Sequence, residues 1–371
     1  MKNTISIILV AILIFSSAFA VSAEVYKTPE AAELEKEFIY GEGPEVNGIS
    51  VDYRYFSPVK KKDKKKYPLV VWFHGLGDGG SEGRQIEASN IAEWATEDYQ
   101  SRFKGAGGAF IIAPRSDAGQ DTWSDDYIAV VRATLDEFIA KNKKNIDVKR
   151  IYVGGYSMGG KMTLKMLTAY PEMFAAAFPI CPAWVPSEEA TACFKDVPVW
   201  MTSGAKDNLV NYYAFATTTW KNIISQSNVA ELCRYSILLS TLYPDGSRAY
   251  SSHLAWYSVN NDMFSEDNGL YPKMKTIDGN NKDVNLIYPD GMISWLSGFK
   301  SNYNGSPATD NGNEQAYTGF ALNVSSFIQE YAENYVNHLK LVSRWYILKP
   351  LIIATLTVLI NLIKLYNLCF V

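Results

Sequence analysis

Apolar runs recur along the middle of the chain and alternate with segments of helical periodicity. Six of these runs, each four to eight residues long, are continuous rather than alternating in polarity. Continuous runs of this length are typical of strands that are covered on both faces, as in parallel sheets. The six runs are YPLVVWF (67–73), AFIIAP (109–114), RIYV (150–153), AAAFPI (175–180), VPVWMTSG (197–204) and RYSILLS (234–240).

Helical patterns lie between these runs. Ile128, Val131 and Leu135 recur at helical spacing within residues 125–142. Further helices are predicted over 158–170, 212–226 and 291–299. Strands that alternate with helices form right-handed βαβ units. The sequence therefore predicts an α/β fold with a mostly parallel central sheet and helices on both faces.

Composition narrows the class of protein further. Of 371 residues, 47% are hydrophobic and 20% are charged, which is the balance of a globular chain rather than a disordered one. The formal net charge is -4, so the composition implies no general affinity for nucleic acid. A protein of this length has room for one large α/β domain or two small ones.

The segment GGYSMGG (154–160) joins the third apolar run to a predicted helix. It matches G-x-S-x-G, the nucleophile elbow, in which a sharp strand-to-helix turn displays a serine at its apex. Glycines on both sides of Ser157 remove Cβ atoms that would collide where the strand and the helix meet. The N–H of Met158 opens the helix and can point at a developing oxyanion. We therefore predict Ser157 as nucleophile and Met158 as an oxyanion donor.

A serine nucleophile needs a base, usually histidine, and this chain has three. In elbow enzymes the chain order is nucleophile, acid, histidine, which leaves His253 and His338 and assigns His74 to the shaping of a loop. His253 follows the sixth apolar run closely, whereas His338 lies beyond a stretch rich in turn formers. We predict His253 as the base.

The acid should follow a strand that lies between the nucleophile and the base. Asp207 stands just past the fifth apolar run and would hold the imidazole in the correct tautomer. Asp196 precedes that run, and Asp245 lies in a YPDG turn. We predict Asp207 as the acid, with a plain turn aspartate as the alternative.

The loop FHGLGDGG follows the first apolar run and is the expected source of the second oxyanion donor. Gly75 and Gly77 allow close backbone approach, and we predict the N–H of Leu76 as the donor. The same loop contains G-x-G-x-x-G, the dinucleotide fingerprint. A nucleotide-binding fold is disfavoured because the acidic residue at the expected distance, Asp98, lies in a polar helical stretch rather than at the end of a strand.

Together these residues resemble the α/β-hydrolase superfamily, and in particular secreted esterases related to polyhydroxybutyrate depolymerases and feruloyl esterases, with a neighbouring group of predicted peptidases. The resemblance covers about residues 68–256. It implies that Ser157, Asp207 and His253 occupy the triad positions and that Leu76 and Met158 form the oxyanion hole. The segments that carry it are VVWFHGLGDGG, RIYVGGYSMGG, PEMFAAAFPICPAW, VWMTSGAKDNLV and TLYPDGSRAYSSHLAW.

The predicted activity is hydrolysis of carboxylic esters, on a small-molecule or polysaccharide-linked substrate such as an acyl or feruloyl ester of plant polysaccharide. Trp123, Trp184 and Trp256 are candidates for lining an acyl pocket, although most tryptophans pack cores. No cofactor or metal is expected, because no cysteine or histidine cluster has zinc spacing. A serine peptidase on the same fold and a non-catalytic binding protein are the alternatives.

The N-terminus has the pattern of a signal peptide over residues 1–23. Lys2 gives a positive start, an apolar stretch follows, and Val21-Ser22-Ala23 supplies small residues for cleavage. We therefore predict a secreted or extracytoplasmic protein, with an N-terminal membrane anchor as the alternative. The catalytic domain is predicted to span 24–300.

Residues 301–343 predict a linker followed by a polar helix, and residues 344–371 form a hydrophobic tail. The uncharged part of the tail covers only ~21 Å as a helix, short of a hydrocarbon core of ~30 Å. Basic residues precede this part, which conflicts with the positive-inside tendency for an exported chain. Membrane association through the tail is therefore possible but not favoured over a packed or poorly ordered tail.

Export permits disulfides. Cys181, Cys193 and Cys233 lie in the predicted catalytic domain, and Cys369 lies in the tail. Cys181 and Cys193 are the nearest pair in sequence, and three reduced thiols are the alternative to a bridge between them.

Overall fold

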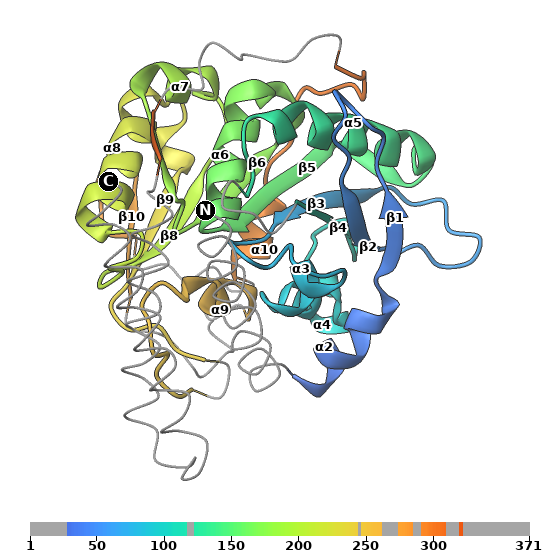
Figure 1. Cartoon of the computed structure of the whole chain (residues 1–371), viewed down its shortest axis with the longest axis horizontal. Helices are drawn as coiled ribbons and strands as arrows, with labels where there is room; N and C mark the ends of the chain where they lie inside the picture. The colour runs from blue at the N-terminus through green and yellow to red at the C-terminus, as the bar shows by residue number, and fades with distance from the viewer. Residues whose placement is uncertain are drawn as a thin grey trace, which may run out of the picture.

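A nine-stranded sheet runs through the centre of the computed structural model, which describes residues 28–116, 122–243, 246–261, 274–284, 291–308 and 319–321 (Figure 1). The strand order is β1-β2-β4-β3-β5-β6-β8-β9-β10. The strands are β1 (Ile39–Glu42), β2 (Asp52–Phe56), β3 (Tyr67–Phe73), β4 (Phe110–Arg115), β5 (Ile146–Tyr156), β6 (Ala176–Ile180), β8 (Trp200–Gly204), β9 (Arg234–Leu238) and β10 (Met274–Asp278).

The six strands from β4 to β9 in this order are parallel, and they are the six apolar runs of the sequence. The predicted α/β class and mostly parallel sheet are therefore confirmed. The antiparallel strands β1, β2 and β10 extend the two edges of the sheet. These edge strands are short and partly exposed, so they lack the continuous apolar pattern that marks the central strands.

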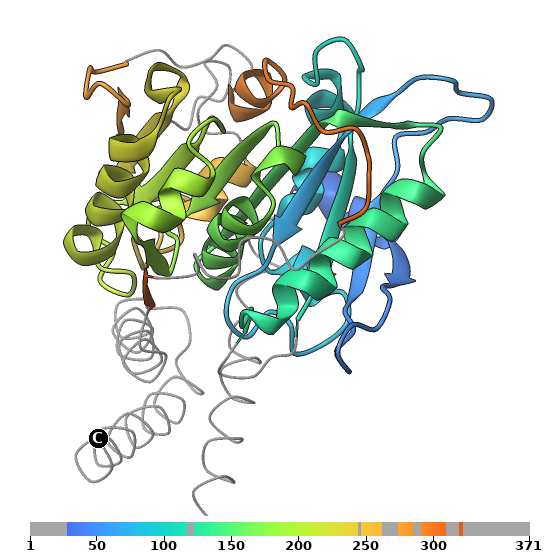
Figure 2. The same ribbon diagram turned by 90° about the horizontal axis from the view of Figure 1, so that it is seen from above.

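Helices cover both faces of the sheet, each with its own hydrophobic cluster (Figure 1). One face carries α5 (Asp126–Lys141), α6 (Met158–Ala169), α7 (Glu188–Cys193) and α8 (Thr217–Gln226). The other face carries α2 (Pro29–Leu34), α3 (Arg84–Glu87), α4 (Glu97–Ser101), α9 (Ala255–Asn260) and α10 (Gly291–Leu296). Figure 2 shows the first layer from above, where α7 contacts both α6 and α8.

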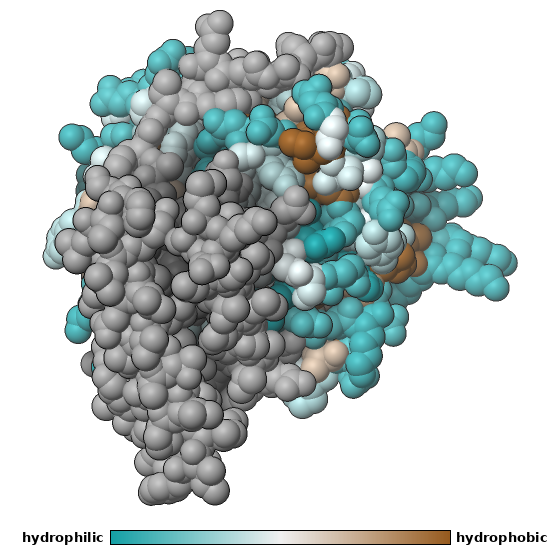
Figure 3. All heavy atoms as spheres, viewed as in Figure 1, coloured by the Kyte–Doolittle hydropathy of each residue, from teal (hydrophilic) through white to brown (hydrophobic). Residues whose placement is uncertain are grey.

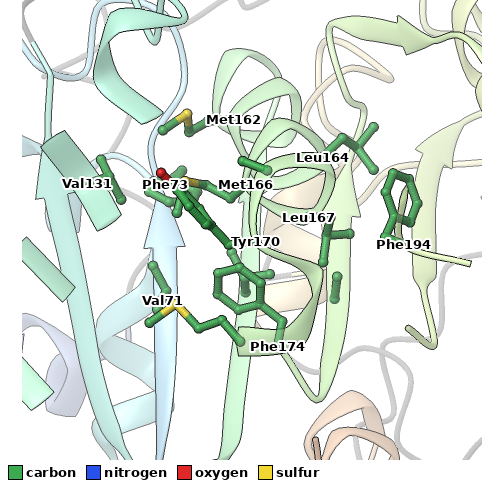
Figure 4. Close-up of a cluster of buried hydrophobic side chains, with 14 of the residues drawn as sticks. Val71, Phe73, Val131, Met162, Leu164, Met166, Leu167, Tyr170, Phe174 and Phe194 are labelled. Atoms are coloured by element: carbon green, nitrogen blue, oxygen red, sulfur yellow. The ribbon is translucent and has the colours of Figure 1, made fainter. Parts of the chain in front are cut away.

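The side chains of β3 pack into the hydrophobic clusters on both faces of the sheet. Because successive side chains of a strand point to opposite sides, Val71 and Phe73 join the cluster under α5 and α6. Val70 and Trp72 join the cluster under α9 and α10. All seven residues of β3 are buried, which explains why the run is continuously apolar. Figure 4 shows Val71 and Phe73 in one cluster with Met166 of α6.

The helix α6 is buried along its whole length, from Met158 to Ala169. It lies against β3, β5 and β6 on one side and is flanked by α5 and α7. Burying one Leu or Met side chain contributes about 1.5–3 kcal/mol of hydrophobic free energy. The helix that begins directly after Ser157 is thus held rigidly by the core.

Segments beyond residue 300 pack on the domain. Tyr303 is buried, and its hydroxyl donates to Asp136 on α5 and lies 3.3 Å from the guanidinium of Arg132. Further on, β11 (Gly319–Ala321) pairs antiparallel with β7 (Trp184–Pro186). The predicted linker over 301–343 thus begins with residues that contact α5.

Several predicted segments lie outside the described residues. They are the signal peptide over 1–23, most of the region 301–343 with His338, and the tail 344–371 with Cys369. Within the described ranges, no helix combines the length and the apolar character needed to cross a bilayer.

The connection between β2 and β3 is strongly basic. Six of its residues are exposed lysines, at 60, 61, 62, 64, 65 and 66. Figure 3 shows hydrophilic side chains projecting on this side of the molecule. Lys66 Nζ donates to the carbonyl of Lys143, which ties the connection to the end of α5. These lysines stand at the N-terminal end of β3, whereas the loop with His74 and Leu76 follows its C-terminal end.

Candidate active site

Ser157 stands in a strained turn between β5 and α6. Its φ is 56° and its ψ is -115°, a backbone conformation that a residue with a Cβ rarely adopts. Its N–H donates to the carbonyl of Ile180 at 2.9 Å, and its carbonyl accepts from the N–H of Ala183 at 3.0 Å. These two bonds, made to the last residue of β6 and to the loop after it, hold the turn in place.

The glycines around Ser157 are required by close backbone packing. A Cβ on Gly155 would lie 2.6 Å from the carbonyl oxygen of Phe73. A Cβ on Gly159 would lie 2.0 Å from the same atom. A Cβ on Gly160 would lie 2.8 Å from Cα of Pro182. The strand, the helix and the neighbouring loop therefore meet at distances that only glycine permits.

Asp207 and His253 form a buried hydrogen-bonded pair. Asp207 follows β8, and its Oδ1 accepts the N–H groups of Leu209 and Val210, both at 3.0 Å. Its Oδ2 accepts from His253 Nδ1 at 2.8 Å. The side chains are 0% and 1% exposed, so water does not compete for this bond. A proton held on Nδ1 leaves Nε2 as the basic nitrogen of a neutral imidazole.

Two contacts connect Ser157 to this pair. Ile180 and Ala183, which bond the Ser157 backbone, flank Cys181, and Cys181 Sγ lies within 4.8 Å of ligand atoms of both Asp207 and His253. The second connection runs through Tyr156, the residue before Ser157. The centroid of its ring lies 4.2 Å from the centroid of the Trp256 ring. The Trp256 ring in turn lies 5.6 Å from the imidazole of His253.

The Ser157 hydroxyl is buried, at 2% exposure for the residue, and Oγ makes no hydrogen bond to any residue in the described ranges. A buried hydroxyl without a partner is costly in an ordinary core.

Cys181 also lies in this neighbourhood, where its sequence had suggested either a bridge to Cys193 or a free thiol. Its thiol donates to the carbonyl of His253 at 3.6 Å. Burial, together with the nearby Asp207 carboxylate, raises the pKa of the Cys181 thiol well above its usual value. Its φ of 43° is also unusual for a residue with a Cβ. Cys181, Cys193 and Cys233, the cysteines in the described residues, are all free thiols.

Within the described part of the chain, the one cluster with metal-ligand proximity is Cys181, Asp207 and His253. The carboxylate and the imidazole of this cluster already bond each other, and the thiol is held in its protonated form by its raised pKa. In this cluster the Asp207 carboxylate and His253 Nδ1 are thus bonded to each other.

The loop after β3 carries the predicted second donor, Leu76. The Leu76 side chain is half-buried, and its N–H donates to no carbonyl among the described residues. The ring of His74 braces this loop: Nδ1 bonds the carbonyl of Gly75 at 2.8 Å, and Nε2 accepts the N–H of Ser116 at 3.2 Å. Burial lowers the pKa of His74 to about 4, so the ring is neutral when it makes these bonds.

The three tryptophans predicted to line an acyl pocket are all buried in packed surroundings. Trp123 donates from Nε1 to the carbonyl of His74 at 3.0 Å and therefore supports the loop that carries Leu76. Trp184 lies in β7, where Lys165 Nζ is 5.4 Å from the ring centroid. Trp256 lies between Tyr156 and His253. Of the three, Trp256 and Trp123 contact residues of the candidate site.

Two further residues of this site lay inside motifs that the sequence analysis quoted. Tyr156 is the variable residue before the serine in the elbow motif, and Asp78 closes the HGLGD segment. Their hydroxyl and carboxylate bond each other in the core. Each of these polar residues stands in a turn that the sequence predicts, one after β3 and one after β5. No pattern in the sequence indicates that the two side chains meet.

A parallel sheet flanked by helices, with a serine in a strand-to-helix elbow and an acid–histidine pair after later strands, defines the α/β-hydrolase class. The chain belongs to the family described as "Putative esterase", whose model matches residues 50–237. Membership confirms the resemblance to α/β-hydrolase esterases found in the sequence.

Individual relatives agree with this family. The chain is 28% identical over 152 residues to the bifunctional acetylxylan esterase/xylanase XynS20E of Neocallimastix patriciarum, which covers 39% of this chain but only 20% of that protein. It is 22% identical over 187 residues to an Arabidopsis thaliana protein named "Probable carboxylesterase SOBER1-like", covering 43% of this chain and 67% of that one.

Among solved structures, the chain is similar to the crystal structure of a thermostable esterase. The TM-score is 0.50 at 25% sequence identity, and the match covers 62% of this chain and 61% of that one. The enzyme class predicted from the sequence, a carboxylic ester hydrolase, is therefore the class to which the family and these relatives point.

Proposed function

We propose that this protein hydrolyses carboxylic esters through a Ser157–His253–Asp207 triad and an acyl-enzyme intermediate. The observation that carries the proposal is the buried 2.8 Å bond between Asp207 Oδ2 and His253 Nδ1, in a fold that also holds a buried serine in an elbow, Ser157. A carboxylate in this position orients the imidazole and stabilises the imidazolium that forms during the reaction.

In the proposed reaction, Ser157 Oγ attacks the ester carbonyl carbon while His253 Nε2 takes the hydroxyl proton. The tetrahedral intermediate collapses, the alcohol leaves with the proton from His253, and the acyl group stays on Ser157. Water then attacks the acyl-enzyme with His253 again as base, which releases the carboxylic acid. The first step needs a hydrogen bond from Ser157 Oγ to His253 Nε2, and catalytic hydrogen bonds of this kind commonly form or tighten only when substrate binds.

The oxyanion of both tetrahedral intermediates would be bound by the N–H groups of Leu76 and Met158. Two features support this assignment: the Leu76 N–H is not used by the described residues, and Met158 is the first residue of the buried helix α6. Helix N-terminal N–H groups carry partial positive charge and are suited to an oxyanion.

The proposed substrate is a small-molecule or polysaccharide-linked ester, such as an acyl or feruloyl ester of plant polysaccharide. The similarity to a protein named as an acetylxylan esterase supports an acyl group on a polysaccharide. The proposed site of action is outside the cytoplasm, which the signal-peptide pattern over residues 1–23 supports.

A substrate panel on the purified protein tests this function. We expect turnover of p-nitrophenyl acetate, with acetylated xylan and methyl ferulate as candidate natural substrates. A fluorophosphonate probe should label the protein, and Ser157→Ala should lose both labelling and turnover. Peptide cleavage without ester cleavage would favour a serine peptidase, and absence of both with intact folding would favour a binding protein.

A further inference from the structure

The side chain of Tyr156 connects the separate parts of the candidate active site. It directly precedes Ser157 at the end of β5. Its ring packs so closely on the loop after β3 that a Cβ on Gly75 would lie 2.5 Å from Tyr156 Cε2. The same ring lies 4.2 Å from that of Trp256 between centroids, and Trp256 contacts His253. One aromatic side chain thus contacts two parts of the site. The first is the loop after β3, residues 74–80, which carries Leu76 and is called the oxyanion loop below. The second is Trp256, which packs on the proposed base, His253.

The hydroxyl of Tyr156 makes a second connection to the oxyanion loop. It donates to Asp78 Oδ2, and Asp78 follows Leu76 by two residues. The N–H of Asp78 lies 3.4 Å from the carbonyl of Gly75, which closes the turn that contains Leu76. On its other side, Asp78 Oδ1 is 3.8 Å from Nε of Arg84, the first residue of α3. The carboxylate is therefore held between β5 and α3.

This hydrogen bond lies away from water. Asp78 is 3% exposed and Tyr156 is 2% exposed. Burial raises the pKa of Asp78 to about 6, although Arg84 and the Tyr156 hydroxyl oppose the shift. Burial also raises the pKa of Tyr156 well above its usual value, so the hydroxyl keeps its proton and remains the donor. Hydrogen bonds to an ionised acceptor are stronger than neutral ones, and a low dielectric strengthens them further.

We propose that Tyr156 and Asp78 are positioning residues, which lock the loop carrying Leu76 to β5, the strand that directly precedes Ser157. The lock sets the distance between the nucleophile and an oxyanion donor, and neither residue touches the reacting atoms. The inference rests on the proposed function for its catalytic consequence. Because oxyanion donors act on the transition state, loosening the lock should lower kcat more than it changes KM.

The first test is the variant Tyr156→Phe, which keeps the ring and removes only the hydroxyl. We expect kcat for p-nitrophenyl acetate to fall about 10- to 100-fold, less than the full loss of one donor, with KM changed less than about threefold. The control is Tyr152→Phe, which also removes a buried hydroxyl from β5. That hydroxyl bonds the carbonyl of Phe299 at 3.3 Å rather than the oxyanion loop. We expect the control to keep kcat within about twofold.

The second test changes the acceptor. Asp78→Asn keeps an oxygen that can accept from Tyr156, whereas Asp78→Ala keeps none. We expect the asparagine variant to retain more kcat than the alanine variant. In the double variant of Tyr156→Phe with Asp78→Ala, the losses should not multiply, because both changes break the same bond. Losses that multiply would overturn the proposal.

A third measurement does not depend on activity. Hydrogen exchange followed by mass spectrometry reports the opening of residues 74–83. We expect this segment to exchange several-fold faster in Tyr156→Phe than in the unmodified protein, and at an unchanged rate in Tyr152→Phe. Unchanged exchange in Tyr156→Phe would overturn the proposed lock. Absence of ester turnover in the unmodified protein would refute the proposed function instead, and the exchange comparison would still decide on the lock.

Discussion

Gly159 lies against the carbonyl of Phe73 at a distance that leaves no room for a methyl group. A Cβ at residue 159 would stand 2.0 Å from that oxygen and 2.6 Å from the carbonyl oxygen of His74. The last residue of β3 and the first turn of α6 therefore touch through their backbones. This contact fixes the turn at Ser157 and the start of the loop after β3 relative to each other.

The variant Gly159→Ala should lose much of the protein's stability. The added methyl meets backbone atoms that cannot rotate away, so we expect the free energy of unfolding to fall by about 3 kcal/mol or more. Urea denaturation followed by tryptophan fluorescence measures the change. Gly48→Ala is the matched control, because Gly48 has a φ of 79° with no atom within 4 Å of the added carbon. The control should lose only about 1–2 kcal/mol.

Substitutions in the Asp207–His253 pair should separate the base from its alternative. His253→Ala and Asp207→Asn should each lower kcat on the order of 10⁴-fold, since one removes the base and the other its orienting charge. Steady-state kinetics with p-nitrophenyl acetate measures both. His338→Ala should keep the activity of the unmodified protein. Loss of turnover in His338→Ala with retention in His253→Ala would assign the base to residue 338.

Gly77→Val tests the backbone of the oxyanion loop without creating a clash. Gly77 has a φ of 84°, and no atom lies within 4 Å of an added Cβ. A β-branched residue cannot keep this φ easily, so the turn beside Leu76 should shift. Losing one oxyanion donor lowers turnover about 10²–10³-fold. We expect a loss approaching this size, with fluorophosphonate labelling of Ser157 retained.

The control for Gly77→Val is Gly105→Val, since Gly105 has a φ of 75° and equally open surroundings. It lies between α4 and β4, away from the oxyanion loop. Its backbone strain should be similar, but kcat should not change. Equal losses of kcat in the two variants would show that strain, rather than donor placement, limits turnover.

His74 should make stability depend on pH. Burial lowers its pKa from 6.5 to about 4, so the folded protein holds it neutral in a range where the unfolded chain binds a proton. Its contribution is therefore fully present above pH 6.5 and is lost as the pH falls through about 4. The shift corresponds to at most about 3 kcal/mol. Urea titrations between pH 7 and pH 4 should show a smaller decline in His74→Gln than in the unmodified protein. Parallel declines in the two proteins would contradict this role.

The sequence predicted the central strands and the long helices because those elements are buried on the faces that periodicity reveals. The strands β1, β2 and β10 at the edges of the sheet were missed, since partly exposed residues carry no such pattern. The contact of Asp207 with His253 joins residues far apart in the chain, and it was predicted from their order after successive strands. The place of Cys181 beside His253 was not predicted, because nothing in its local sequence reveals a neighbour 72 positions away.

The bond between Tyr156 and Asp78 shows the same limit. Each residue stands in a motif that was recognised, but a hydrogen bond between two turns depends on how β3 and β5 are aligned. Alignment of neighbouring strands is set by packing on both faces of the sheet, which local patterns do not encode. The composition of each turn could therefore be interpreted, but the bond between them could not.

The exposed lysines between β2 and β3 provide a site at which the protein can be attached to a solid support. They are separated from the proposed nucleophile by the length of β3, about 20 Å for seven residues. Six primary amines within seven positions are the densest group of its kind along the chain. Coupling to an amine-reactive resin would therefore favour attachment at this end and leave the opposite end of the sheet facing the solution. An immobilised preparation should keep access to large, polymer-linked substrates.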